Sequence, residues 1–314
     1  MRADLVNIMT KNLINLPHLA AMVFGVPHYV TRQTMDSVKA VLVPRIQGLS
    51  EEAGIHMTQD PDNNQAPDLV QPAGGMAVIP VHGILVPRRG QITAMCSELT
   101  SYERIRSQVH AALNDPSISE IVLDINSGGG AAVGCKELAD YIFQSRQTKP
   151  ITAIVNYSAY SAAYFIASAC SKIVVSQTSG VGSIGVIMEH LDTSRMEEQM
   201  GLTFTTIFRG DNKNNGTQHE PLSEDARGMF QRMIDEMYET FITSVAEYRN
   251  LATQTVINTQ AGIYFGADSI SAGLADEVSD PQSAINAIAA KYKQPQRTTS
   301  IKLQAAAMDL QTRM

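Results

Sequence analysis

Two side chains in this sequence could together cleave an acyl bond. Ser161 follows the strand-like run 151–155 and precedes small apolar residues, so its hydroxyl is expected at a helix N-terminus. Free N–H groups and positive potential there would favour a developing oxyanion, although an ordinary helix cap has the same pattern. A serine hydroxyl needs a base, and a neutral lysine amine can serve. Lys213, in the polar loop RGDNKNN, can meet Ser161 through folding or through contact between subunits; the sequence leaves both open.

Two glycine-rich segments could shape such a site. Consecutive glycines at 128–130 free the backbone to direct N–H groups at an oxyanion or a phosphate. This segment lacks the Gly-Lys-Ser/Thr of a P-loop and the full dinucleotide fingerprint. The segment GVGSIG (180–185) indicates a close approach of backbones. Taken alone, the first segment is more often just a tight turn, and the second is more often a loop at a strand end.

Histidine is the rival base. His190 follows Ser161 by 29 positions, and a Ser-His-Asp triad would need a third residue such as Asp211 or Asp235. The other histidines have no metal-ligand spacing, so we expect no metal site. Three scattered cysteines are too few for a disulfide framework or a zinc site. We expect no cofactor.

The elements that must position these residues alternate in type from Met76 onward. Strand patterns lie at 76–86, 121–125, 151–155, 172–176 and 186–188, and helical patterns lie at 102–114, 133–145, 161–171 and 222–250. This alternation predicts an α/β fold of stacked βαβ units with a mainly parallel sheet. Ser223 is the expected cap of the last helix. The apolar stripe of that helix is expected to pack in the core and comprises Met229, Met233, Met237, Phe241 and Val245.

Composition shifts divide the chain into four parts. Residues 1–49 predict an N-terminal helical extension, and residues 50–75, rich in Asp, Asn, Gln, Pro and Gly, predict a flexible linker. Residues 76–292 form the main domain, and residues 293–314 form a polar, then Ala- and Gln-rich C-terminal tail.

Composition and charge exclude several classes of protein. The chain has 314 residues, 44% of them hydrophobic and 18% charged, which excludes disorder throughout. The net charge of −7 argues against a protein that mainly grips nucleic acid. The apolar run 19–26 is too short to span a membrane, and the N-terminus is a poor export signal. We therefore expect a soluble, unexported protein with neither nucleic acid nor membrane as partner.

The order of the motifs resembles a known family. The segments are LDINSGGG (123–130), YSAAYFIASACSKIVVSQT (160–178), GVGSIGVIMEH (180–190), FRGDNKN (208–214) and ADSISAGLADEV (267–278). In this order they resemble the signal peptide peptidase A family of serine proteases, within the Clp/crotonase fold. NLPHLAAMVF (15–24) resembles the branch of tailed-phage head maturation proteases.

The resemblance implies a role for seven residues. They are the nucleophile Ser161, the general base Lys213, the oxyanion-hole residues Gly129, Gly130 and Ala162, the lysine-orienting Ser183 and the alternative base His190. The motif match favours Lys213 over His190. The chain departs from the family at Gly128, where proline is usual, and at Ala162-Ala163, where Gly-Gly is commoner.

The implied function is a Ser-Lys endopeptidase of phage prohead or capsid maturation. It would cleave scaffold, portal or capsid segments and itself, in the host cytoplasm or inside the prohead, as a homo-oligomer such as a ring. The tail 293–314 would be the start of a scaffold segment, a truncation or a cleavage product, and the sequence leaves these three open. Three alternatives stay open: a bacterial cytosolic signal-peptide-peptidase-like peptidase, a catalytically idle capsid-assembly protein, and an acyl-CoA enzyme of the crotonase fold.

Overall fold

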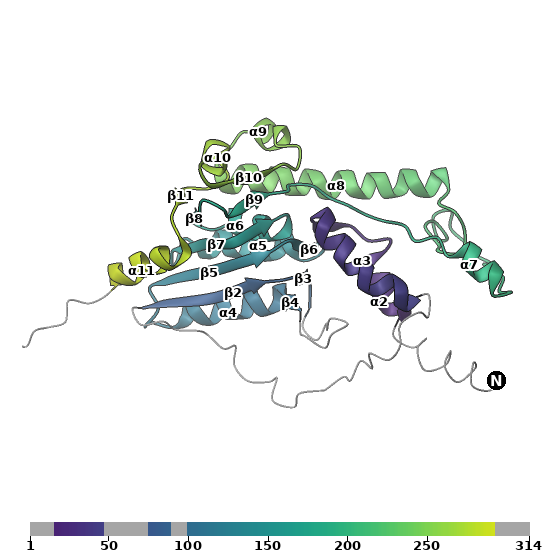
Figure 1. Cartoon of the computed structure of the whole chain (residues 1–314), viewed down its shortest axis with the longest axis horizontal. Coiled ribbons are helices and arrows are strands. Elements are labelled where there is room, and N and C mark those ends of the chain that lie inside the picture. The colour runs from purple at the N-terminus through teal and green to yellow at the C-terminus, as the bar shows by residue number, and fades with distance from the viewer. Residues whose placement is uncertain (1–15, 47–74, 89–98, 293–314) are drawn as a thin grey trace, which may run out of the picture.

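A seven-stranded sheet forms the centre of the molecule (Figure 1). The computed structural model describes residues 16–46, 75–88 and 99–292. The strands are β2 (Met76–His82), β5 (Glu120–Ser127), β7 (Ile151–Tyr160), β8 (Lys172–Val175), β9 (Gly180–Gly182), β10 (Ile263–Phe265) and β11 (Glu277–Val278). The order is β10-β9-β7-β5-β2, with β8 joining β7 and β11 joining β8, and only β9 and β10 pair antiparallel. The predicted α/β fold with a mainly parallel sheet is confirmed.

A second, four-stranded sheet adjoins the carboxyl end of β5. Its order is β1 (His28–Val30), β6 (Gly129–Ala131), β3 (Leu85–Val86) and β4 (Thr100–Ser101). Strand β1 is antiparallel to β6, whereas the other pairs are parallel. A strand from the N-terminal extension therefore pairs with the predicted glycine turn.

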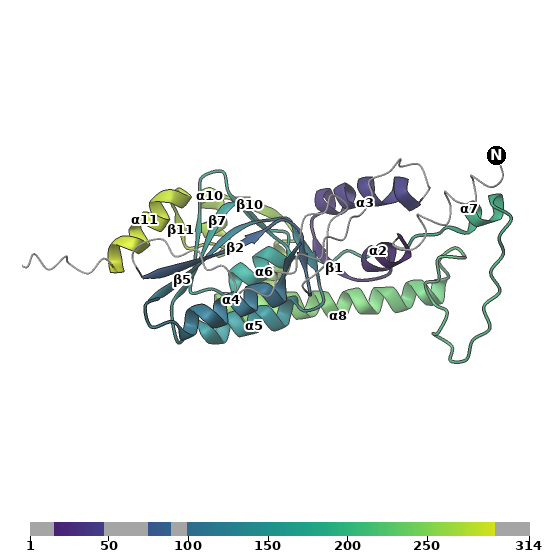
Figure 2. The same ribbon diagram turned by 90° about the horizontal axis from the view of Figure 1, so that it is seen from below.

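Helices cover both faces of the central sheet (Figures 1 and 2). The helices α4 (Tyr102–Asn114), α5 (Cys135–Ser145), α6 (Ala162–Ser168) and α8 (Glu224–Arg249) lie on one face, and α11 (Pro281–Tyr292) lies on the other. Because side chains alternate along a strand, Ile121, Leu123 and Ile125 of β5 join the core beneath the first group. Val122 points the opposite way and packs with Ile288 beneath α11.

The start of α8 and the bounds of α4 confirm sequence-based expectations, but one strand differs. Ser223 caps α8, its Oγ accepting the N–H of Ala226 at 3.2 Å. The prediction of a strand at 186–188 was wrong, because Ile187 forms only an isolated bridge with His28. The fifth parallel strand is β9 instead. The sequence pattern did not indicate β9, because this strand contains two glycines and glycine is depleted in strands.

Helix α8 extends well beyond the sheet in both views (Figures 1 and 2). Its 26 residues correspond to about 39 Å of helix. In its C-terminal half, Phe241 and Val245 are buried as predicted. Met237 is half-buried and also packs against this core, whereas Met229 and Met233, nearer the start of the helix, are half-buried without being part of it. Core packing within this chain therefore explains only one end of the stripe.

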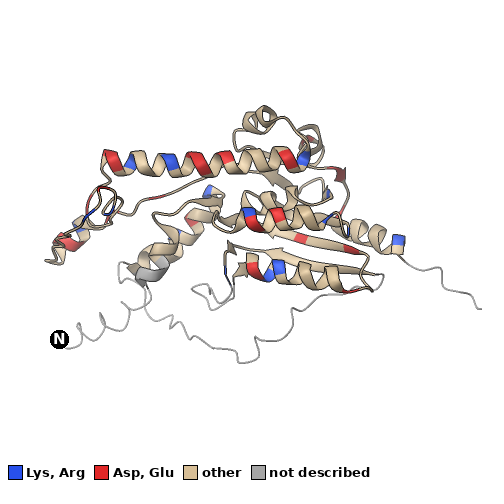
Figure 3. Ribbon diagram, turned by 180° about the vertical axis from the view of Figure 1, so that it is seen from behind, with Lys and Arg blue, Asp and Glu red and all other residues tan. Residues whose placement is uncertain are grey.

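Of the remaining described helices, two lie in the N-terminal extension, one lies between β9 and α8, and two follow α8. They are α2 (Leu16–Val23), α3 (Arg32–Ile46), α7 (Ser194–Gln199), α9 (Thr253–Asn258) and α10 (Gly266–Ser271). The linker 50–75, except Gly75, and the tail 293–314 lie outside the described residues, so the predicted division of the chain stays a prediction. None of the described helices is long and apolar enough to cross a membrane. Acidic and basic residues are interspersed along α8 on the face seen in Figure 3.

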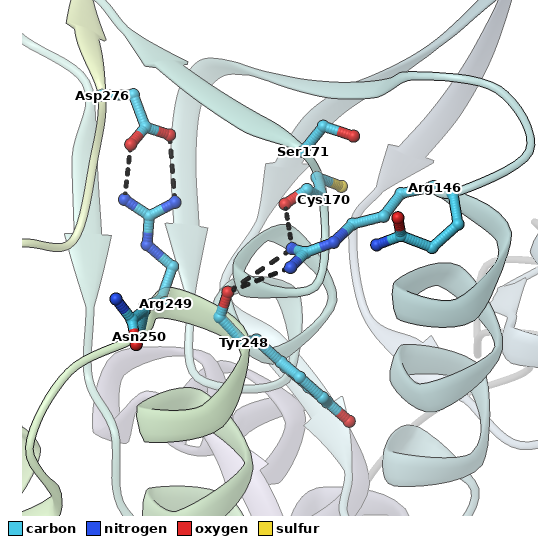
Figure 4. A pocket seen from close by; sticks show the side chains of 8 residues that line it. Arg146, Cys170, Ser171, Tyr248, Arg249, Asn250 and Asp276 are labelled. Carbon is cyan, nitrogen blue, oxygen red and sulfur yellow. Dashed lines mark hydrogen bonds and ion pairs between the residues drawn. The ribbon is translucent and has the colours of Figure 1, made fainter.

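A polar hollow of about 410 Å³ lies at the C-terminal ends of α6 and α8 (Figure 4). Arg146 donates to the Cys170 carbonyl at 2.7 Å, and Arg249 forms a two-bond ion pair with Asp276 at 2.7 and 3.0 Å. Asp276 also accepts the N–H of Ile173 at 2.7 Å. These side chains donate to carbonyls at helix ends and link the end of α8 to β8. The residues around the hollow therefore have a structural role.

Removing the Asp276 charge is expected to destabilise this link between α8 and β8. Burial raises the pKa of the Asp276 carboxyl, but the hydrogen bonds and charge of Arg249 outweigh burial, and the net shift is downward. Asp276→Asn should lower the free energy of unfolding by about 2 kcal/mol at neutral pH. The difference should shrink as the pH falls below 3.8 and through the lowered pKa, because the Asp276 carboxyl then becomes neutral, as the asparagine amide is at every pH. Urea unfolding at several pH values measures it.

The matched control is Glu277→Gln, which breaks the exposed Lys172–Glu277 pair on the neighbouring strands. Its effect should stay within about 0.5 kcal/mol. Equal losses in the two variants would show that the Arg249–Asp276 pair has no special role.

Candidate active site

Ser161 is a one-residue turn between a strand and a helix. Strand β7 ends at Tyr160 and α6 begins at Ala162, so Ser161 alone reverses the chain, with φ 55° and ψ −116°. This backbone region costs about 1–3 kcal/mol and persists only where neighbours hold it. The residue is fully buried, and its Oγ has no hydrogen-bond partner within the described ranges. A buried hydroxyl without a partner has a desolvation cost, which indicates a role beyond packing.

Two glycine segments hold this turn from opposite sides. The Ser161 N–H donates to the Gly182 carbonyl at 2.9 Å. A Cβ atom at Gly129 would stand 3.1 Å from Ser161 Cβ and 2.2 Å from the Tyr29 carbonyl oxygen, and one at Gly130 would stand 1.9 Å from the Leu85 carbonyl oxygen. Side chains are thus excluded at both positions. The glycine pattern that the sequence analysis singled out reflects close packing around Ser161.

The predicted oxyanion donors differ in their surroundings. The Gly129 N–H already donates to Ser127 Oγ at 3.1 Å. Gly130 lies opposite Tyr29 in the β1–β6 ladder. Ala162 is the first residue of α6, and a first-turn N–H has no partner within its own helix. The Thr31–Gly128 bond makes Tyr29 and Gly130 the next hydrogen-bonded pair of the ladder, so the Gly130 N–H faces the Tyr29 carbonyl and can serve an oxyanion only when β1 leaves. Ala162 remains as a candidate donor, and Gly129 leaves space beside Ser161 Cβ.

The structure brings Ser183 close to the Ser161 turn. Gly182 pairs with Tyr160, so the residues that follow each of them, Ser183 and Ser161, are neighbours at the ends of β9 and β7. The φ of Ser183 is also 55°, and its N–H donates to the Gly262 carbonyl at 2.9 Å. Two strained serines thus share one corner of the sheet.

The structure does not bring Lys213 to Ser161 within one chain. Lys213 is exposed, in a loop that packs against the start of α8, where Asn215 contacts Met229 at 3.9 Å. Ser161 instead begins α6, whose Phe165 stacks on Phe241 at 4.5 Å. About 18 Å of helix separates Met229 from Phe241.

His190 lies with the Lys213 loop. Its Nε2 donates to the Thr217 carbonyl at 2.9 Å, and its ring lies 6.5 Å from that of Phe230, near the start of α8. Neither candidate base therefore meets the nucleophile in a single copy. Asp211 and Asp235, the candidate third residues of a triad, are both exposed.

Strand β1 covers the site, although the sequence predicts a helical extension over residues 1–49. His28–Val30 instead forms a strand that pairs with the glycine turn. The signal was available as the β-prone run Tyr29-Val30-Thr31 after Pro27. Three residues are too few for a periodicity argument.

The described residues contain no cluster of His, Cys, Asp or Glu that could hold a metal ion. Cys135 and Cys170 are buried free thiols whose pKa burial raises, so the reactive thiolate is disfavoured. Cys96 lies outside the described residues. Among the groups that the structure describes around the turn, Ser161 is the candidate nucleophile.

Comparison with known proteins finds a peptidase family and two phage proteins that are similar to this chain. The model of "Peptidase family S49" matches residues 144–294, a range that includes both Ser161 and Lys213. The head-tail preconnector protein GP5 of Enterobacteria phage P21 is 40% identical over 215 residues, covering 68% of this chain and 43% of that protein. The capsid assembly protease C of Escherichia phage lambda is 32% identical over 294 residues, covering 88% of this chain and 66% of that protein. The chain thus spans less than two thirds of either relative.

A solved structure of a ClpP1 point mutant from Listeria monocytogenes is also similar. It has a TM-score of 0.40 and 12% sequence identity, and the match covers 66% of this chain and 94% of that one. The resemblance drawn from the ordered motifs is confirmed by the family match and the phage relatives: the chain contains a domain of peptidase family S49.

Proposed function

We propose that this protein is a serine endopeptidase of phage capsid maturation that uses a dyad of Ser161 and Lys213. The observation that carries the proposal is the buried Ser161 Oγ, which has no hydrogen-bond partner within the described ranges and lies on a strained turn between two glycine segments. The family match supports peptidase activity. The name of the similar lambda protein supports a role in capsid assembly.

The chemistry follows from the site. A neutral lysine amine removes the Ser161 proton as Oγ bonds to the substrate carbonyl carbon. The N–H groups of Ala162 and, once β1 has left, of Gly130 stabilise the resulting oxyanion, and one such donor contributes about 3–4 kcal/mol. The amine then protonates the leaving nitrogen as the peptide C–N bond breaks. Water, deprotonated by the same amine, hydrolyses the acyl-serine and restores both groups.

The lysine comes from a neighbouring copy in this proposal. Residues 186–223, here called the arm, carry Lys213 away from Ser161 along α8 (Figures 1 and 2). The arm exposes a run of large apolar side chains: Met200, Leu202, Phe204, Ile207 and Phe208. Ile207 is 95% exposed. Apolar surface of this kind marks an interface, and the half-buried Met229 of α8 contacts Asn215 of the arm at 3.9 Å.

A second copy is the occupant that the observations favour for this surface. Packing the arm of one copy on the core of the next would bury its apolar side chains and bring Lys213 to a foreign Ser161. Burial in a water-poor interface favours the neutral form of a lysine amine. The proposed substrates are scaffold, portal or capsid segments and the protease itself, cleaved in the host cytoplasm or inside the prohead.

Loss of either dyad residue should abolish cleavage. Ser161→Ala and Lys213→Ala should each lower the rate of self-trimming or scaffold cleavage at least about a thousandfold. Intact-mass spectrometry of the incubated proteins measures it. Arg209→Ala is the matched control, because it removes a positive charge from the same loop.

His190→Gln tests the rival base, because glutamine keeps an N–H donor for the Thr217 carbonyl. It should retain the wild-type rate within about threefold. Loss of activity in His190→Gln with retention in Lys213→Ala would assign the base to His190. Activity in Ser161→Ala would end the proposal. Folded but inactive wild type would favour an idle assembly role.

Mixing the two inactive proteins should restore activity if the dyad forms between copies. Each site of a random mixture draws its serine and its lysine from different chains, so about a quarter of the wild-type rate is expected. The measurement is scaffold cleavage after Ser161→Ala and Lys213→Ala proteins are co-assembled. A mixture as inactive as its components would place the dyad within one chain.

Ile207→Glu should weaken self-association. Burying an isoleucine contributes about 1.5–3 kcal/mol, so association should weaken at least about tenfold. Light scattering after size-exclusion chromatography measures the assembly. Val41→Glu on α3, where Val41 is 45% exposed, is the control for adding a charge at an exposed apolar position. Unchanged assembly of Ile207→Glu would remove the arm from the interface.

A further inference from the structure

Strand β1 lies in a slot between two backbone segments of the main domain. On one side it is antiparallel to β6, with Tyr29 opposite Gly130, and the Thr31 N–H donates to the Gly128 carbonyl at 3.0 Å. On the other side, His28 and Ile187 exchange two backbone hydrogen bonds, at 2.9 and 3.0 Å. A segment bonded along both edges occupies a place that an extended peptide could take by strand addition.

The slot lies directly over the Ser161 turn. A single Cβ atom built at Gly129 would stand 2.2 Å from the Tyr29 carbonyl oxygen and 3.1 Å from Ser161 Cβ. The Tyr29 carbonyl and the serine therefore flank the same small space. A nucleophile must lie close to the carbonyl that it attacks, so Tyr29 marks the place of the residue before a scissile bond.

The Tyr29 side chain fills an aromatic pocket built on the helix that Ser161 begins. It is 1% exposed, and its ring centroid lies 5.7 Å from that of Phe165 on α6 and 4.7 Å from that of Phe241 on α8. Its hydroxyl donates to the Met237 carbonyl at 2.7 Å. Aromatic walls with one polar acceptor suit a tyrosine or another large apolar side chain.

The chain that follows β1 is held at the rim by weaker contacts. Glu189, which follows the slot residue Ile187, pairs with Arg32 and with Lys39 of α3, the latter at 2.9 Å. The Arg32 side chain is 60% exposed, and ion pairs of this kind contribute little each. The deep anchor of the strand is the buried Tyr29, so a competing segment can replace the strand if that segment fills the same aromatic pocket.

We propose that His28–Val30 is a resident substrate mimic. It occupies the slot in which an extended segment of a protein substrate binds antiparallel to β6, with a large aromatic or apolar side chain in the Tyr29 pocket. The strand must leave before that substrate can reach Ser161. The inference rests on the proposed function for its catalytic meaning, and its test requires no catalysis.

The test measures peptide binding to the full chain with Ser161→Ala, which prevents cleavage. The probe is a fluorescent peptide with the sequence of residues 25–31, GVPHYVT, which lacks Arg32 and so cannot itself pair with Glu189. Glu189→Gln loosens the resident strand by removing the charge that pairs with Arg32 and Lys39. Because apparent affinity scales with the open fraction, this variant should bind the peptide about three- to tenfold more tightly. Fluorescence anisotropy gives the two dissociation constants.

Two matched controls accompany the measurement. Glu277→Gln breaks an exposed ion pair on β11 and should leave peptide binding unchanged. A peptide with the Tyr29→Ala change should bind at least about tenfold more weakly, because it leaves the aromatic pocket empty. Equal affinities for the two peptides, equal affinities of the two protein variants, or no binding at all would each overturn the proposal.

A deeper change strengthens the test where the protein stays folded. Tyr29→Ala in the protein should raise peptide affinity more than Glu189→Gln does, and Glu189→Gln alone decides the question if Tyr29→Ala unfolds. In the background with Ser161 intact, Glu189→Gln should also raise the rate of peptide hydrolysis. Binding without hydrolysis would leave the slot in place and refute the proposed catalytic role. Hydrolysis without the predicted binding differences would refute the slot alone.

Discussion

The arrangement around the candidate site depends on one backbone constraint: the chain passes from β7 to α6 through Ser161 alone, at a positive φ of 55°. Such a turn is unfavourable by itself and persists because the surrounding structure fixes it. The Gly182 carbonyl holds the Ser161 N–H, and Gly129 leaves room beside its Cβ. The parallel sheet fixes the ends of β5, β7 and β9 relative to one another. The Ser161 hydroxyl is buried because the turn places it among these strand ends. The glycine turn has no side chains because it packs directly against Ser161.

In the proposed function, one copy of the chain does not form a complete catalytic site. The space above Ser161 is filled by β1, with Tyr29 anchored between Phe165 and Phe241. The lysine proposed as base lies at the far end of α8, on an arm whose apolar side chains face solvent. In this account two movements make the site competent: the resident strand leaves, and the arm of a second copy arrives. Coupling catalysis to assembly in this way would keep the enzyme inactive until copies gather.

The fold was largely predictable, because the spacing of apolar residues along the sequence indicates most helices and strands. The α4 bounds, the Ser223 cap of α8 and the strands around 121–125 and 151–155 each follow from patterns of ten or so residues. The ordered motifs also indicated Ser161 and its glycines. Periodicity could not reveal the three-residue strand β1, the glycine-rich β9 or the distance between Lys213 and Ser161. These depend on tertiary pairing between segments far apart in the sequence and, for Lys213, on the course of the arm along α8.

The central claim is that Ser161 is the nucleophile of an assembled protease, and a covalent label tests it most directly. The assembled protein is treated with a fluorophosphonate, which reacts with activated serines, and the adduct is located by peptide mass spectrometry. The account predicts one adduct, on Ser161, that is lost in Lys213→Ala and absent from the neighbouring Ser183. An adduct on another serine, or equal labelling of Ser161 with and without Lys213, would contradict it.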